Sequence, residues 1–167
     1  MELTKKMQDA INEQISKEMW SANLYLSMSA YCAHIGLDGF AHWMLLQSRE
    51  EMDHAQDMMR FLLMRRGEVK IQAVPAVETN FGTPCEVAEA FHQHECLVSG
   101  LIQGVISVAR AEGDMASEDF FWGCVREQVE EEDNASRMVE DFRIAGENRA
   151  ALMHLDRKLG QRAAAAE

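Results

Sequence analysis

The chain has 167 residues, of which 47% are hydrophobic and 26% charged, with only 2 prolines, and this composition favours a single packed, helix-rich domain. The formal net charge is -12, and no cluster of lysine and arginine offsets it, so we expect no nucleic-acid partner. There is no apolar signal core, no run of 18 apolar residues and no C-x-x-C pair among the 4 cysteines, so we expect no membrane partner and a cytoplasmic location.

Turn signals divide the chain into long segments. Two short turns rich in Gly and Asp, HIGLDG at 34–39 and AEGD at 111–114, separate segments that have helical periodicity. The segment 66–82 is longer, contains Pro75 and has no helical period, so we expect it to be a crossover. Thr83 then begins the sequence TPCE, a capping box that predicts the start of a new helix.

These signals predict five helices, over residues 4–34, 38–65, 83–111, 115–145 and 148–159. Asp38 is expected to cap the second helix, and Gly146 is expected to end the fourth. The predicted fold class is therefore all-α: two antiparallel helical hairpins joined by a long crossover form a four-helix bundle, and a short fifth helix follows. We expect a single domain over residues 1–167.

Each of the four long predicted helices has an apolar stripe at spacings of three and four residues, and polar side chains interrupt each stripe near its middle. The interrupting residues that can bind metal are Glu18 on the first helix, Glu51 and His54 on the second, Glu95 on the third, and Gln128 and Glu131 on the fourth.

The interruptions are predicted to lie at one level of the bundle. Glu18 and Glu51 are 33 residues apart, as are Glu95 and Gln128, and the midpoints of both pairs fall in the two short turns. Residues equidistant from the turn of an antiparallel hairpin lie side by side, here roughly 25 Å from the turn at about 1.5 Å per residue. The two hairpins also repeat one another at an interval of 77 residues, so we expect all the polar groups to converge at the bundle centre.

A cluster of carboxylates in an apolar core must be protonated, paired with cations or bound to metal. No Lys or Arg lies on the four stripes at this level, so metal is the favoured interpretation. Carboxylates with one or two imidazoles suit iron or manganese, and bridging carboxylates let two ions sit roughly 3.5 to 4 Å apart. We therefore favour a di-iron centre. The alternative, a non-catalytic acidic helical bundle, leaves the buried glutamates unexplained.

The motifs also resemble those of a known family. Glu18 followed by Tyr25, then REEMDHA, HECLVSGLI and VREQVEEE in this order, are similar to the bacterial non-haem ferritins across essentially the whole chain. Such ferritin-like proteins use a Glu from each of two helices and a Glu-x-x-His from each of the other two. The fourth helix departs from that scheme, because Gln128 and Glu131 stand where the second Glu-x-x-His would recur.

Other relatives with this bundle are disfavoured. Bacterioferritins bind haem and keep both Glu-x-x-His motifs, which this chain does not. Met52 stands where they place a haem-ligating methionine, but a methionine there is also common without haem. A small DNA-protecting relative would have its metal site between subunits, and a rubrerythrin-like peroxidase would have C-x-x-C pairs. A haem-binding bacterioferritin-type protein therefore remains only as the alternative.

The resemblance implies two overlapping sets of iron ligands: Glu18, Glu51 and His54 for one ion, and Glu51, Glu95 and Glu131 for the other. It implies that Gln128 is a neighbouring or weak oxygen ligand, so that the second ion is held more loosely. Tyr25 resembles the tyrosine that abuts this centre in the family, and it would modulate oxidation.

Three further glutamates, Glu50, Glu127 and Glu130, lie beside the inward stripes. The resemblance implies a third iron site there, facing the interior of a shell and passing ferric ions to a growing mineral. The alternative is a solvated acidic face.

The function implied by the resemblance is iron storage with ferroxidase activity: Fe2+ is oxidised to Fe3+ by dioxygen or peroxide and stored as ferric oxide. The family forms a hollow 24-subunit homo-oligomeric shell, and the fifth helix, AALMHLDRKL, would line its fourfold openings. Independently, four apolar residues lie off the inward stripes, so we expect them to be exposed and to support an oligomer: Trp20, Leu24, Tyr31 and Trp43.

Overall fold

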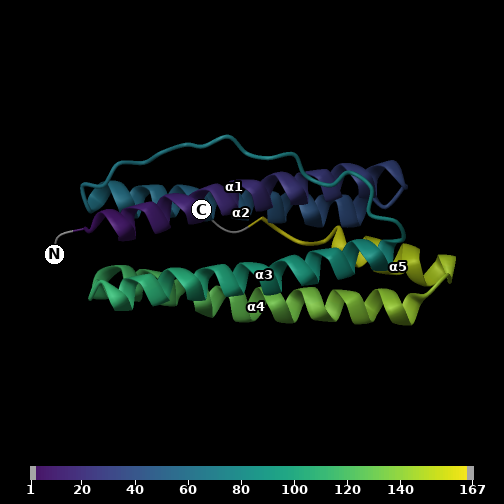
Figure 1. Ribbon diagram of the computed structural model, residues 1–167. Coiled ribbons are helices and arrows are strands. Elements are labelled where there is room, and N and C mark those ends of the chain that lie inside the picture. Colours follow the sequence, from purple (N-terminus) through teal and green to yellow (C-terminus); the bar gives the residue numbers. More distant parts are fainter. Residues whose placement is uncertain (1–2, 165–167) are drawn as a thin grey trace.

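The computed structural model describes residues 3–164, and this part of the chain forms five α-helices and no strand. They are α1 (Lys5–His34), α2 (Asp38–Met64), α3 (Pro84–Ala111), α4 (Met115–Ala145) and α5 (Arg149–Leu159). Figure 1 shows α1 beside α2 and α3 beside α4, with the crossover running along the length of the bundle. The all-α four-helix bundle with a short fifth helix is thus confirmed, and the predicted helix ends agree to within one residue.

Local capping explains where most helices begin and end. Thr83 and Glu86 form the predicted capping box: the Thr83 hydroxyl accepts from the Glu86 N–H at 3.3 Å, and the Glu86 carboxylate accepts from the Thr83 N–H at 2.7 Å. Gly146 ends α4 with a positive φ of 53°, which glycine adopts without strain. The predicted cap at Asp38 is wrong. Asp38 is already the first residue of α2, and Leu37 precedes it without a capping side chain.

The apolar core consists of two clusters separated along the bundle axis. One contains Phe40, Phe91 and Phe142, and the other contains Ile11 and Phe121. Each of these side chains is at most 2% exposed, and burial of such a side chain stabilises the fold by roughly 1.5 to 3 kcal/mol. The level predicted for the polar groups lies between the two clusters, so the apolar packing on both sides fixes the helices around it.

The expectation that four apolar residues would be exposed is wrong for two of them. Leu24 and Trp43 are only 6% and 9% exposed, because both pack into the first core cluster. Trp20 and Tyr31 are partly buried against the same cluster, and the Tyr31 hydroxyl donates to the Gly82 carbonyl at 2.6 Å. These residues therefore belong to the fold of the single chain.

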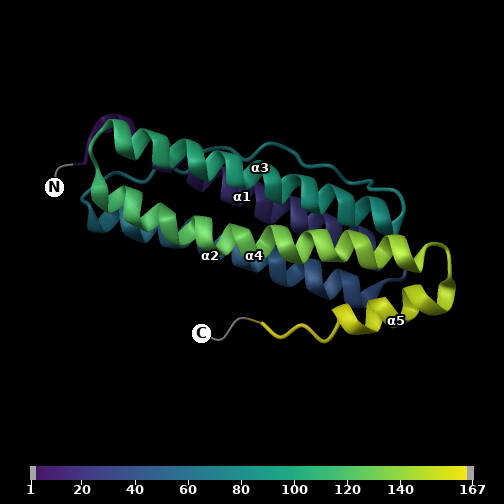
Figure 2. The same ribbon diagram turned by 90° about the horizontal axis from the view of Figure 1, so that it is seen from below.

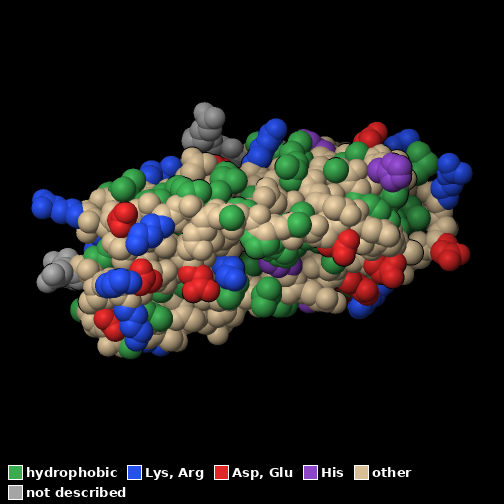
Figure 3. All heavy atoms as spheres, turned by 45° about the horizontal axis from the view of Figure 1, so that its top comes forward, with side chains coloured by type: hydrophobic (Ala, Val, Ile, Leu, Met, Phe, Trp, Pro, Cys, Tyr) green, Lys and Arg blue, Asp and Glu red, His purple; other side chains and the backbone are tan. Residues whose placement is uncertain are grey.

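The surface is mixed in character. On the face shown in Figure 3, charged side chains gather mainly toward the two ends of the molecule, and many hydrophobic side chains lie between them. Across the described residues, no helix is long and apolar enough to cross a membrane.

Candidate metal centre

Three of the predicted ligands meet between α1 and α2. Glu18, Glu51 and His54 each place a ligand atom within 4.8 Å of the others. Glu18 and Glu51 are 1% and 2% exposed, whereas His54 is half-buried. The spacing of three between Glu51 and His54 puts both on one helical face, and the hairpin brings Glu18 level with them.

The Glu51 carboxylate has an unsatisfied oxygen. Its Oε2 atom is buried, has no hydrogen-bond partner among the described residues, and lies 3.7 Å from His54 Nδ1. A buried polar atom without a partner costs roughly 1 to 3 kcal/mol, and more if it is charged. A cation bound between these three side chains would remove that cost, so the donor set fits a metal ion.

The opposite hairpin supplies Glu95, which is completely buried on α3. Its carboxylate accepts a hydrogen bond from the Tyr25 hydroxyl on α1 and another from Gln128 Nε2 on α4, at 2.8 Å. The Gln128 amide also donates to the Glu95 backbone carbonyl at 3.1 Å. Tyr25 packs edge to face against Phe91. In this arrangement Gln128 acts as a hydrogen-bond donor that orients Glu95.

Glu131 on α4 belongs to the same region. Its Oε2 accepts from Gln47 Nε2 on α2 at 2.9 Å, so the two residues join the hairpins at the centre. Burial, followed by the charges of Glu95 and Glu50, raises the pKa of Glu131 to about 7. Glu18, Glu51 and His54 thus form one group at this level, and Gln128 bonds to Glu95. The Glu95 charge acts on both Glu51 and Glu131.

The pKa values of the buried carboxyls in the centre are raised. Burial, with the nearby Glu51 carboxylate, raises the pKa of Glu18 to about 8. Burial and the Glu95 charge raise the pKa of Glu51 well above its ordinary range, and burial also raises the pKa of Glu95. These carboxyls lie too close together, in too apolar a medium, for all to be ionised without a cation. Hard oxygen donors with one imidazole suit iron or manganese.

The three outer glutamates do not come together. Glu127 Oε2 lies 3.8 Å from His54 Nε2, Glu50 pairs with Arg162, and Glu130 is exposed. Within residues 3–164 these three carboxylates do not form a group close enough to share an ion. The third iron site therefore stays a prediction.

An opening between α2 and α4 leads toward the centre. A surface groove of about 190 Å³ is lined by residues that include His54, Phe120 and Glu127. A small pocket of about 10 Å³ shares His54 and Cys124 with this groove and is also lined by Glu18. The half-buried His54 thus stands between solvent and the buried carboxylates.

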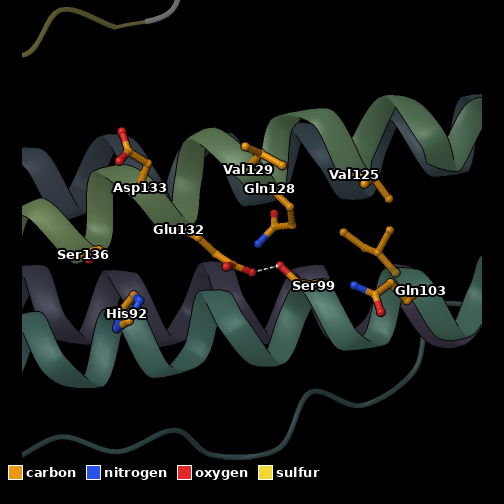
Figure 4. Close-up of a pocket in the computed structure, with 10 residues that line it drawn as sticks. His92, Ser99, Gln103, Val125, Gln128, Val129, Glu132, Asp133 and Ser136 are labelled. Carbon is orange, nitrogen blue, oxygen red and sulfur yellow. Dashed lines mark hydrogen bonds between the residues drawn. The ribbon is translucent and has the colours of Figure 1, made fainter.

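A second groove, of about 510 Å³, lies between α3 and α4 (Figure 4). Gln128 points from α4 toward α3 in this view, beside the hydrogen bond between Ser99 and Glu132. Gln128 is the one predicted metal-centre residue among those that line it, so Gln128 separates this groove from Glu95.

Sequence reasoning missed Arg162, which follows α5. The stripes contain no Lys or Arg at the level of the centre, as predicted, but Arg162 reaches this level from outside them. Its guanidinium donates to Gln47 Oε1 at 2.8 Å and to Glu50 Oε2 at 2.5 Å. No periodic pattern signals this contact, because it depends on where α5 docks.

An antiparallel bundle of four long helices, with buried carboxylates and an imidazole at one level, is the architecture of the ferritin-like metal-binding proteins. Comparison with known proteins supports this class. A family model described as a ferritin-like domain matches residues 8–145.

Similar individual proteins span nearly the whole chain. A bacterial non-heme ferritin from Bacteroides fragilis is 49% identical over 160 residues, which cover 96% of this chain and 99% of the relative. One from Campylobacter jejuni is 34% identical over 87% of each chain. The crystal structure of an open pore ferritin from Archaeoglobus fulgidus has a TM-score of 0.95 and 40% identity, and covers 96% of this chain and 99% of that one. The chain therefore belongs to the ferritin family.

Proposed function

We propose that this protein stores iron and has ferroxidase activity: it oxidises Fe2+ to Fe3+ at a buried di-iron centre and stores ferric oxide in a hollow homo-oligomeric shell of 24 subunits in the cytoplasm. The observation that carries the proposal is the unpartnered Glu51 oxygen between Glu18 and His54. Membership of the ferritin family supports it.

In the proposed centre, Glu18, Glu51 and His54 bind one Fe2+ ion, and Glu51, Glu95 and Glu131 bind the second. Glu51 is shared, which is consistent with its burial among the other carboxylates. Hard carboxylate oxygens stabilise Fe3+ more than Fe2+, so the ligand set favours oxidation. Tyr25 and Gln128 hold Glu95 in place through their hydrogen bonds.

Each of the two possible oxidants takes up two electrons, so a pair of Fe2+ ions is needed. Two Fe2+ ions release two electrons, which together with two protons reduce dioxygen to hydrogen peroxide, or hydrogen peroxide to two molecules of water. The carboxyls also release protons as the ions bind, because their raised pKa values keep part of them protonated near neutral pH. The opening at His54 and Glu127 gives the ions a path between solvent and the centre.

The proposal is tested by anaerobic Fe2+ titration followed by stopped-flow mixing with dioxygen, for wild type, Glu51→Ala and His54→Ala. Loss of a ligand should slow the initial oxidation by roughly 10- to 100-fold or more, as even loss of the groups that orient metal ligands has effects of this size. Glu140→Ala, at an exposed position of α4, is the matched control. Fast oxidation that is unchanged in both centre variants would overturn the proposal.

The assembly is tested separately by sedimentation of the metal-free protein. The expected species has the mass of 24 chains of 18.9 kDa each. A stable monomer or dimer at micromolar concentration would contradict the storage role, because neither encloses a cavity for a mineral.

A further inference from the structure

We propose that Arg162 is an internal counter-ion of the metal centre: its guanidinium occupies the cation position at Glu50, so metal binds there only when the C-terminal arm, residues 160–164, releases that carboxylate. This inference rests on the proposed function, because it concerns the edge of the same centre. The arm thus controls whether a metal ion binds Glu50.

The Arg162 side chain is held more firmly than a typical surface arginine. Its guanidinium donates to Glu50 Oε2 at 2.5 Å, to Gln47 Oε1 at 2.8 Å and to the Trp43 carbonyl at 3.4 Å. It also lies over the Trp43 ring, 4.2 Å from the centroid, in a cation–π contact. The Arg162 and Glu50 side chains are only 20% and 27% exposed, so solvent screens the pair weakly.

The docking of α5 brings the arm to this place. The Phe40 N–H donates to the Asp156 carboxylate at 2.9 Å, which ties α5 to the start of α2. Gly39 allows this close approach, because a Cβ atom there would lie 1.8 Å from the Asp156 carbonyl oxygen. From α5 the arm runs back beside α2 (Figure 2), and His42 contacts the Arg162 carbonyl at 3.0 Å. The guanidinium therefore lies one to two turns further along α2.

A short chain of contacts connects Arg162 to the centre. Gln47 accepts from Arg162 with its Oε1 atom and donates to Glu131 with its Nε2 atom. Glu50 directly precedes Glu51 in sequence, and its charge acts on both Glu51 and Glu131. A change of cation at Glu50 therefore alters the electrostatic potential at Glu51 and Glu131, two of the carboxylates that are proposed to hold iron.

A guanidinium 2.5 Å from Glu50 Oε2 competes with a metal ion for that carboxylate, because the two cations would repel each other at short range. While Arg162 is in place, it offsets the charge of Glu50 and limits the negative charge around the metal-free centre. When it leaves, Glu50 becomes a free anionic ligand on the side of the centre that faces the arm. Arg162 thus opposes metal binding at Glu50 without contacting Glu18, Glu51 or His54.

The test measures how many Tb3+ ions each subunit of the metal-free assembled protein binds, by equilibrium dialysis and by luminescence excited through tryptophan. Tb3+ is a hard, oxygen-seeking trivalent probe. Arg162→Met retains a long apolar side chain but removes the charge and the donors. We expect it to bind one more Tb3+ per subunit than wild type, or the same ion roughly tenfold more tightly, equivalent to about 1.4 kcal/mol.

Three further proteins control this experiment. Glu50→Gln combined with Arg162→Met should lose the additional binding, since the ligand is gone. Arg162→Lys retains the charge and should stay within a few-fold of wild type. Arg157→Met changes an exposed arginine of α5 and should have no effect. If Arg162 only anchored the arm, none of these variants would change the number or affinity of ions at Glu50.

Unchanged Tb3+ binding in Arg162→Met would overturn the inference, as would additional binding that survives the loss of Glu50. Both results are independent of Fe2+ oxidation, which depends on Glu51 and His54. A protein that fails to oxidise iron but still gains a Glu50-dependent ion would refute the proposed function alone. A protein that oxidises iron normally but gains no ion would refute the role of Arg162 alone.

Discussion

Gln128 on α4 donates hydrogen bonds to both the carboxylate and the backbone carbonyl of Glu95 on α3, at 2.8 and 3.1 Å. The two residues are 33 positions apart and face each other across the hairpin. The Gln128 amide is neutral and donates a hydrogen bond, so it can lie close to the Glu95 carboxylate. A second carboxylate at this position would be repelled by Glu95 in the absence of metal.

Gln128→Glu should therefore lower the stability of the metal-free protein and raise its affinity for metal. The variant places two buried carboxyls together, so the metal-free protein should unfold several degrees lower, whereas the second ion should bind more tightly to the added anionic ligand. Thermal unfolding with and without Zn2+ measures both effects. Gln103→Glu, at an exposed position of α3, is the matched control. An unchanged melting temperature of metal-free Gln128→Glu would contradict this account.

Tyr25→Phe removes the hydroxyl that donates to Glu95 but retains the ring that packs against Phe91. The pKa of Glu95 should rise further, because the hydrogen bond from Tyr25 lowers it. Stopped-flow oxidation should slow several-fold while the melting temperature stays close to that of wild type. Tyr31→Phe loses a hydroxyl that bonds to the Gly82 carbonyl, away from the centre, and should oxidise iron normally. Equal rates for the two variants would rule out the proposed role of Tyr25.

Metal binding should release protons near neutral pH. The pKa values of about 8 for Glu18 and about 7 for Glu131 mean that both carboxyls are at least partly protonated at pH 7 in the metal-free protein. Binding of Zn2+ should then release at least one proton per subunit, and its affinity should rise with pH up to about 8. Calorimetry in buffers of different ionisation enthalpy measures this release. Binding without proton release at pH 7 would show that the carboxyls are already ionised.

The stability of the metal-free protein should fall as pH rises from about 4.5 to about 8. In this interval the Glu18 carboxyl is ionised in the unfolded chain but protonated in the folded one, so the unfolded state binds fewer protons and each increase in pH favours unfolding. Above the pKa of Glu18 in the folded state, this loss of stability is complete. Glu18→Gln should flatten this dependence in thermal unfolding at a series of pH values. A metal-free protein that becomes more stable over the same interval would contradict the pKa assignment.

Two glycine substitutions should have opposite effects. A Cβ atom at Gly39 would collide with the Asp156 carbonyl, so Gly39→Ala should detach α5 from α2 and lower the melting temperature. At Gly100, inside α3, a Cβ atom would meet nothing within 4 Å. Gly100→Ala should therefore stabilise the protein by about 0.5 to 1 kcal/mol, since alanine loses less backbone entropy in a helix. Hydrogen exchange of α5 should increase only in Gly39→Ala, and equal exchange in the two variants would show that this contact does not hold α5.

Much of the fold could be predicted because helix geometry relates sequence spacing to position. The repeats of 33 and 77 residues indicated that Glu18, Glu51, Glu95 and Gln128 share one level, and within each hairpin the structure brings the paired residues together: Glu18 with Glu51, and Glu95 with Gln128. What spacing could not predict is how each group is used. The amide of Gln128 donates to Glu95, and Gln47, which was not among the expected ligands, holds Glu131.

The sequence by itself determined the five helices and the buried level of carboxylates, since local periodicity and a constant rise per residue are sufficient for these. The family was indicated separately, by the resemblance of the motifs around Glu51, Glu95 and Gln128. Only the tertiary structure decided that Trp43 is buried, that Asp38 does not cap α2 and that Glu50 pairs with Arg162. The physical reason is that tertiary contacts join distant parts of the chain: Trp43 packs against Phe91 of α3, and the docking of α5, through contacts such as that between Phe40 and Asp156, places Arg162 beside Glu50. No helical period specifies such contacts.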